Sequence, residues 1–152
     1  MIYSDQVVSD QYIRLRGIFE MKVMKNGVVI ERYRDDNLIV DAARSSLARL
    51  LSGEGAATKK VTQIGFGTSG TAPATTDTSL TSSFIKNIDS YSYPAAGQVS
   101  FAWSLSTTEA NGKSIQEVGL ISADGTLFAR KTRGVIEKAS DISLSGSWTI
   151  IF

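Results

Sequence analysis

Three tight-turn signals divide this sequence into short segments. Asn26-Gly27, Asn111-Gly112 and Asp124-Gly125 are dipeptides typical of β-hairpin turns, because their residues tolerate the positive φ angles that such turns require. The segments around them are rich in β-branched and aromatic residues and alternate between apolar and polar positions, as half-buried strands do. A chain built from such hairpins is largely restricted to antiparallel β architectures.

The alternation predicts a mainly β fold with a single short helix. The expected strands cover residues 12–24, 28–34, 60–67, 84–94, 98–107, 114–122, 126–132 and 142–152. The helix is expected at about 41–52, with Asp41 capping its first amides and Gly53 as a left-handed stop. These elements favour an antiparallel β-sandwich or a partly closed barrel of seven to eight strands.

The domain organisation is expected to be simple. The chain has 152 residues, which is an ordinary size for one domain. Residues 1–11 are polar without a clear period, so we interpret them as an N-terminal arm that becomes ordered only against a partner. Residues 12–152 then form a single β-rich domain.

Composition excludes several classes of chemistry. The chain has no cysteine and no histidine, so disulfides, thiolate metal sites and Ser-His-Asp catalysis are excluded. The net charge is only +1, which does not favour nucleic acid or an anionic membrane as a partner. No apolar stretch approaches the roughly 20 residues of a membrane span. We therefore expect a soluble protein without cofactor, bound metal, small-molecule substrate or enzymatic activity.

A G-x-G-x-x-G pattern at Gly65, Gly67 and Gly70 could suggest a nucleotide-binding loop. Such a loop must open a helix whose N-terminus holds the phosphates. The residues that follow are rich in Thr, Ser and Ala and predict a loop instead. We interpret Gly65 and Gly67 as sites of a bulge or a close backbone approach, and Gly70 as a turn.

Several acidic residues are candidates for a site. Asp35, Asp36, Glu109 and Glu117 could supply a glycosidase pair, which needs two acids facing each other across a cleft. Calcium at Asp35 and Asp36, or at Asp77, is an open alternative, although no twelve-residue calcium loop exists.

Two further charged features are expected to be structural. Glu117 stands in an otherwise apolar strand, so we expect an ion pair, for example with Arg130 across the Asp124-Gly125 turn, and we assign Asp124 to that turn. We interpret the basic run 130–133 as a solvated strand end or a subunit contact.

The last expected strand carries an apolar face. Trp148, Ile150 and Phe152 alternate with polar residues and Ile151. Because chain ends usually fray unless they are held, we expect Phe152 to lie in the core or in a subunit interface.

The sequence resembles a family of small structural proteins from the particles of tailed bacteriophages. The resemblance rests on "LRGIFEMKVMKNGVVIERYRDDNLIVDAARSSLARLL", "IGFGTSGTAPATTDTSL" and "EANGKSIQEVGLISADGTLFARKTRGVIEKASDISLSGSWTIIF". Within the last segment, "IQEVGLISADGTLFAR" is similar to a segment of tail-fibre and baseplate-attachment domains, in which a strand of the form Glu-hydrophobic-Gly-Leu precedes an Asp-Gly turn. In this sequence, Glu117 and Gly119 are the glutamate and the glycine of that strand.

The resemblance implies a non-enzymatic virion component located at the tail, the baseplate or a fibre attachment. Capsid decoration or a head fibre is the alternative. The expected partners are further copies of the chain, in a ring or trimer, and other virion proteins. A carbohydrate-binding module using Tyr91, Tyr93 or Trp103 is a competing function from another class. The candidate structural and interface residues are Gly65, Gly67, Glu117, Gly119, Asp124, Gly125, Arg130, Trp148 and Phe152.

Overall fold

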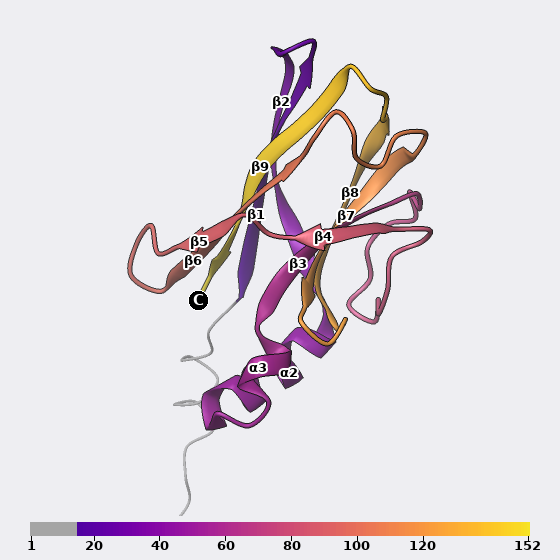
Figure 1. The fold of residues 1–152 in the computed structure, drawn as a ribbon. Coiled ribbons are helices and arrows are strands. Elements are labelled where there is room, and N and C mark those ends of the chain that lie inside the picture. The colour runs from indigo at the N-terminus through magenta and orange to yellow at the C-terminus, as the bar shows by residue number, and fades with distance from the viewer. Residues whose placement is uncertain (1–14) are drawn as a thin grey trace, which may run out of the picture.

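A computed structural model describes residues 15–152 of the chain (Figure 1). The proposed arm, residues 1–11, lies outside the described residues. The described part contains two helices and nine strands, which are β1 (Arg16–Lys25), β2 (Val28–Ile39), α2 (Asp41–Ser52), α3 (Ala56–Lys59), β3 (Val61–Gly67), β4 (Phe84–Asn87), β5 (Ser90–Ser92), β6 (Gln98–Leu105), β7 (Ser114–Ser122), β8 (Leu127–Glu137) and β9 (Ile142–Ile151).

The nine strands form one curled, half-barrel sheet in the order β4-β3-β7-β8-β2-β1-β9-β6-β5. Every pairing in the sheet is antiparallel. The expected β class and the partly closed architecture are therefore confirmed. The strand count is higher than expected because the segment predicted as one strand, 84–94, forms both β4 and β5.

Two segments of the chain pass from one half of the curled sheet to the other. β2 pairs with β1 over most of its length but meets β8 only at Leu38 and Ile39. At the two sheet edges, β4 and β5 are separated in sequence only by Ile88 and Asp89. The Ile88 amide donates to Thr62 O of one half (3.0 Å), and the Asp89 amide donates to Ala102 O of the other (2.8 Å). The chain thus links the two edges directly, as corner strands do in packed sheets.

The core lies inside this curl. Phe19 of β1 stacks on Trp103 of β6 at 5.5 Å and meets Trp148 of β9 edge-on at 4.9 Å between ring centroids. Phe66 of β3 contacts Trp103 from the other half, at 5.6 Å. Alternate residues of β1, from Gly17 to Val23, are buried as the alternation predicts. Aromatic contacts across the curl therefore hold its two halves together.

The helical segment differs from expectation at its start. α2 begins at Asp41 itself, Val40 occupies the N-cap, and no side chain caps the helix, so the prediction of an Asp41 cap is wrong. Val40 is fully buried and its amide donates to Phe128 O of β8 at 3.1 Å, which fixes the entry of the chain without a polar cap. Gly53 has φ 78° and ends the helix as predicted.

The helices have two further features that the sequence did not predict. The short helix α3 follows α2 directly. Leu51 of α2 is 91% exposed although it is apolar, whereas Ala43 and Ser46 are buried. No helix between residues 15 and 152 is long and apolar enough to cross a membrane.

Candidate functional site

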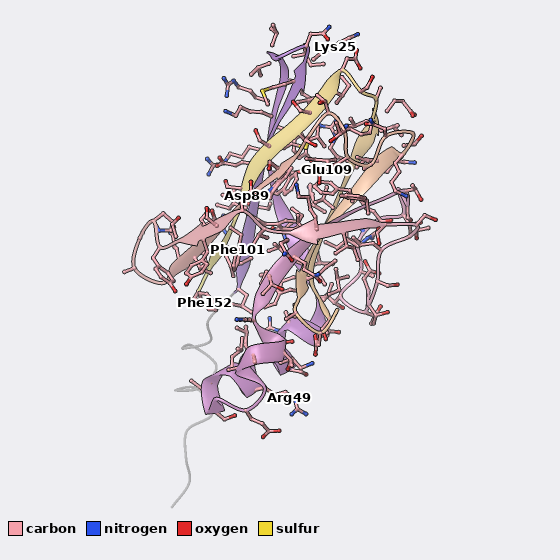
Figure 2. The ribbon with its side chains drawn as sticks, in the orientation of Figure 1. Lys25, Arg49, Asp89, Phe101, Glu109 and Phe152 are labelled. Atoms are coloured by element: carbon pink, nitrogen blue, oxygen red, sulfur yellow. The ribbon has the colours of Figure 1, made fainter. Side chains whose placement is uncertain are left out.

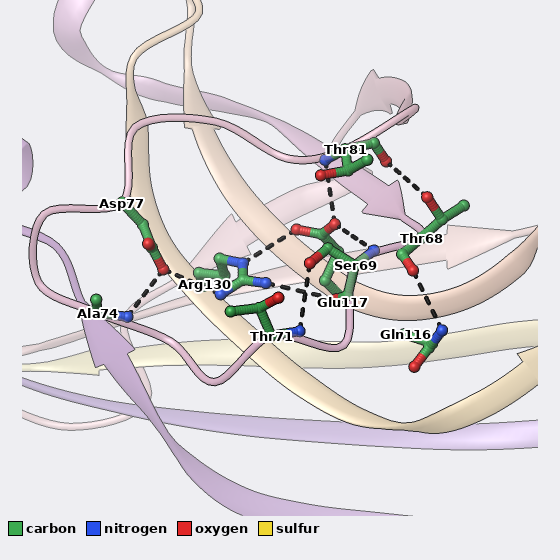
Figure 3. A network of polar contacts seen from close by, with 9 residues as sticks. All are labelled: Thr68, Ser69, Thr71, Ala74, Asp77, Thr81, Gln116, Glu117 and Arg130. Carbon is green, nitrogen blue, oxygen red and sulfur yellow. Dashed lines mark hydrogen bonds and ion pairs between the residues drawn. The ribbon is translucent and has the colours of Figure 1, made fainter.

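The most connected polar group of the described chain is a buried ion pair between neighbouring strands. Glu117 of β7 is 1% exposed and Arg130 of β8 is 4% exposed. Arg130 Nε donates to Glu117 Oε1 at 3.0 Å (Figure 3). The predicted pair is therefore confirmed. Burying such a pair is costly unless its remaining hydrogen-bonding atoms also find partners.

The loop of residues 68–83 supplies those partners. Glu117 Oε2 accepts hydrogen bonds from the amides of Ser69 (2.7 Å) and Thr81 (3.1 Å). Arg130 Nη1 donates to Asp77 Oδ2 at 3.0 Å, and Nη2 donates to Ser69 O at 3.4 Å. As Figure 3 shows, the loop wraps over the pair and contacts it from several points along its length. The network therefore holds an irregular segment of the chain against the sheet.

Asp77 is a residue whose role the sequence analysis missed. It was considered only as a calcium ligand, yet its carboxylate binds Arg130 and accepts the Ala74 amide at 2.9 Å. Asp77 is the only charged residue between positions 68 and 83. That isolated charge in a polar, uncharged loop was the available signal.

Three glycines allow this loop to lie directly on the sheet. A Cβ at Gly65 would meet Leu80 Cδ1 at 2.7 Å, and one at Gly119 would meet Leu80 Cδ1 at 3.0 Å. A Cβ at Gly67 would meet both Glu117 Oε2 and Thr81 O at 2.8 Å. The interpretation of Gly65 and Gly67 as close approaches is confirmed. The segment after Gly67 is a loop, as expected, and not the helix that a nucleotide site requires.

Gly67→Ala is expected to lower the free energy of unfolding by about 1–3 kcal/mol, the usual cost of overpacking. The added methyl has to displace either the carboxylate of Glu117 or the backbone at Thr81. Gly134→Ala is the matched control, because a Cβ there meets nothing within 4 Å. Urea unfolding of the two variants gives the comparison, and equal stabilities would contradict a close approach at Gly67.

The turn between β7 and β8 forms a second polar cluster. Gly125 has φ 88°, and Asp124 Oδ1 accepts the Thr126 amide at 3.1 Å, so the assignment of Asp124 to the turn is confirmed. Lys59 Nζ of α3 lies 2.6 Å from Asp124 Oδ2. The hydrogen bond from Lys59, followed by those from Thr126, lowers the pKa of Asp124 to about 2. The turn is thereby tied to the helical segment.

This pKa gives a prediction for acid unfolding. A depressed pKa contributes stability that is present above the ordinary value of 3.8 and is lost as the pH falls toward 2. Asp124→Asn is therefore expected to flatten the loss of stability between about pH 4 and pH 2, and Lys59→Gln should flatten it similarly by removing the partner. Urea unfolding across this pH range tests both variants. An unchanged slope in both would contradict the coupling.

Two other acidic candidates each form an ion pair with a different lysine. Asp35 Oδ2 lies 2.6 Å from Lys131 Nζ, and Glu109 Oε1 lies 2.8 Å from Lys86 Nζ. The hydrogen bond from Lys131 lowers the pKa of Asp35, and that from Lys86 lowers the pKa of Glu109. Among residues 15–152 no three acidic side chains gather where they could hold a metal ion.

The basic run 130–133 is not a solvated strand end. Arg130 is buried, Lys131 binds Asp35 of β2, and Arg133 Nη1 lies 2.8 Å from Glu31 of the same strand. Lys131 and Arg133 thus connect β8 with β2 beyond the two-residue ladder of these strands, whereas Arg130 binds Glu117 of β7 and Asp77. The run therefore stabilises the fold by contacts of β8 with β2, with β7 and with the loop of residues 68–83.

An apolar groove of about 770 Å³ opens at the end of the curl. One wall is α2, through Leu47 and Leu50, and the other is the β5–β6 hairpin, through Tyr91 and Tyr93. The floor is formed by buried core residues, namely Phe101, Phe128 and Ile150. The two tyrosines are 64% and 73% exposed, and their rings meet edge-on at 6.0 Å.

The groove corrects two expectations. Trp103 is 1% exposed, so it cannot act as a surface platform for a sugar. Phe152 is 49% exposed and lines the groove, so the core alternative for this residue is wrong, whereas the interface alternative stays a prediction. Figure 2 shows Phe152 beside Phe101 at this end of the molecule. Trp148 and Ile150, with 0% and 1% exposure, are core residues as the alternation predicts.

Comparisons with known proteins give no family: no protein-family model, no curated protein and no solved structure matches this chain.

Proposed function

We propose that this protein is a non-enzymatic structural component of a tailed-bacteriophage particle that assembles through contacts with its own copies and with other virion proteins. The proposed position is the tail, at the baseplate or a fibre attachment, and capsid decoration or a head fibre is the alternative. The observation that carries the proposal is the exposed apolar groove between α2 and the β5–β6 hairpin. The sequence resemblance supplies the bacteriophage setting.

The distribution of polar and apolar groups supports a role in assembly. The buried ion pair of Glu117 and Arg130 is bound by the loop of residues 68–83. Its charges are therefore engaged within the fold and are not presented to a substrate. In contrast, three exposed aromatic side chains line the groove, since Tyr91, Tyr93 and Phe152 are each at least 49% exposed. Contiguous exposed apolar surface of this kind marks interaction sites.

A carbohydrate-binding module is the second candidate. The exposed pair Tyr91 and Tyr93 favours it, because sugar rings stack on exposed aromatic faces. The rest of the groove is lined mainly by Leu, Val, Phe and Ala residues, and such a lining fits a protein segment better than hydroxyl-rich sugars.

Two measurements test the proposed function. Light scattering from low to high micromolar protein should show a defined oligomer, and an antibody against the purified protein should label particles of the phage that encodes it. A protein that stays monomeric at every concentration and is absent from particles would contradict the proposal. Retention on a glycan array that is lost in a Tyr91→Ser/Tyr93→Ser variant would favour the carbohydrate alternative.

A further inference from the structure

We infer that the groove between α2 and the β5–β6 hairpin receives the N-terminal arm, residues 1–11, of a neighbouring copy. The inference rests on the proposed self-assembly and names the contact that makes it. The groove is open, apolar and continuous with the core through Phe101, Phe128 and Ile150.

The arm has the chemistry that the groove requires. Its apolar residues are Met1, Ile2, Tyr3, Val7 and Val8, and it carries two acidic side chains, Asp5 and Asp10, but no basic one. The groove offers apolar walls and one basic side chain, Lys60. The apolar side chains of the arm match the apolar walls of the groove, and its acidic residues are matched in charge by Lys60.

The arm also starts at the correct end of the molecule. Arg16, the first residue of β1, lies opposite Ile151 of β9, and Ile151 lies opposite Gln98 of β6. Gln98 and Phe152 both line the groove. The base of the arm and the groove therefore share one end of the curled sheet, so copies that meet at this end bring arms and grooves together.

The choice of a neighbour's groove over the arm's own follows from the proposed self-assembly, because an arm held in its own groove would contribute no contact between copies. Cross-linking distinguishes these two sources of the arm.

Cysteine cross-linking tests the inference cleanly, because the natural chain contains no cysteine. Val8→Cys protein is mixed with Leu50→Cys protein that carries a size tag, the mixture is oxidised, and the products are separated without reductant. A disulfide between the tagged and untagged chains is expected. Val135→Cys replaces Leu50→Cys as the control, because Val135 is an exposed apolar residue on β8 that does not line the groove, and no comparable product is expected from it.

A double variant, Val8→Cys/Leu50→Cys, separates the two possible sources of the arm. Covalent dimers and larger products support the inference. A cross-link formed only within one chain overturns it, as does a lack of cross-linking by a protein that light scattering shows to be an oligomer. A wild-type protein that never oligomerises overturns the proposed self-assembly as well, so the two failures are distinguishable.

Removal of an aromatic side chain from the groove tests the inference independently. Tyr93→Ser is expected to raise the dissociation constant of the oligomer by about tenfold or more, as removal of an aromatic anchor does. The thermal unfolding of the isolated chain should change little, because Tyr93 is 73% exposed. An unchanged dissociation constant would overturn the role of the groove.

Discussion

Replacing Glu117 with alanine is expected to lower the free energy of unfolding by about 3–5 kcal/mol, the cost of leaving a buried charge without its partner. Arg130 would then lie 4% exposed beside a single remaining acid, Asp77. The amides of Ser69 and Thr81 would also lose their shared acceptor. Since small domains have only about 5–15 kcal/mol in total, urea unfolding should show a large shift of the midpoint.

An exposed ion pair is the matched control. Glu20 of β1 binds Arg34 of β2 at 3.0 Å, but their side chains are 46% and 66% exposed, so Glu20→Ala should cost about 1 kcal/mol or less. Hydrogen exchange should also become faster in residues 68–83 of the Glu117→Ala variant and stay unchanged in the Glu20→Ala variant. Equal losses of stability in both variants would contradict a structural role for the buried network.

The turns were the most predictable part of the fold, because they depend on local backbone preferences. Asn26 and Gly27 both have positive φ, at 51° and 78°, and Gly112 and Gly125 each have φ 88°. Two of the three turns are hairpins, since β1 pairs with β2 and β7 pairs with β8. The Asn111-Gly112 turn is not, because it joins β6 to β7 and these strands do not pair. The strand alternation was equally local, and the burial of every second residue along β1 and β6 follows it.

The arrangement of the strands was not predictable in the same way. The contact of β2 with β8 rests on two residues, Leu38 and Ile39, whose partners lie about ninety positions away. No property of these residues alone distinguishes such a contact from a continued pairing with β1. The division of segment 84–94 into β4 and β5 likewise depends on which edge each half meets. Such choices are made by long-range packing.

The buried network and the groove differ in predictability for a physical reason. A single acid in an apolar strand must find a partner because an unpaired buried charge is too costly. The position of Glu117 therefore predicts that it forms an ion pair. The groove has no such signal. Its walls come from α2, the β5–β6 hairpin and the end of β9. Each of these segments contributes apolar residues that, taken alone, are predicted to lie in the core. The expectation that Phe152 is buried failed for this reason.

The two buried tryptophans offer a sharper comparison of packing with hydrogen bonding. Trp148 Nε1 donates to Asn37 Oδ1 at 2.7 Å. Trp103 Nε1 is buried and has no hydrogen-bond partner within residues 15–152. Both side chains are at most 1% exposed, and both contact Phe19. They therefore differ mainly in whether the indole N–H is satisfied.

Trp148→Ala is expected to lower the free energy of unfolding by about 3–5 kcal/mol, since it removes a large side chain from the centre of the core. Phenylalanine separates the contributions. Trp148→Phe loses packing and also leaves Asn37 Oδ1 without its donor, whereas Trp103→Phe loses packing but removes an N–H that was buried without a partner. Trp148→Phe should therefore destabilise the protein by about 1–3 kcal/mol more than Trp103→Phe does. Urea unfolding of the four proteins, the three variants and the wild type, measures these differences. If the two phenylalanine variants are equally stable, the bond between Trp148 and Asn37 contributes nothing net, and the side-chain contact between β9 and β2 at this end depends on packing alone.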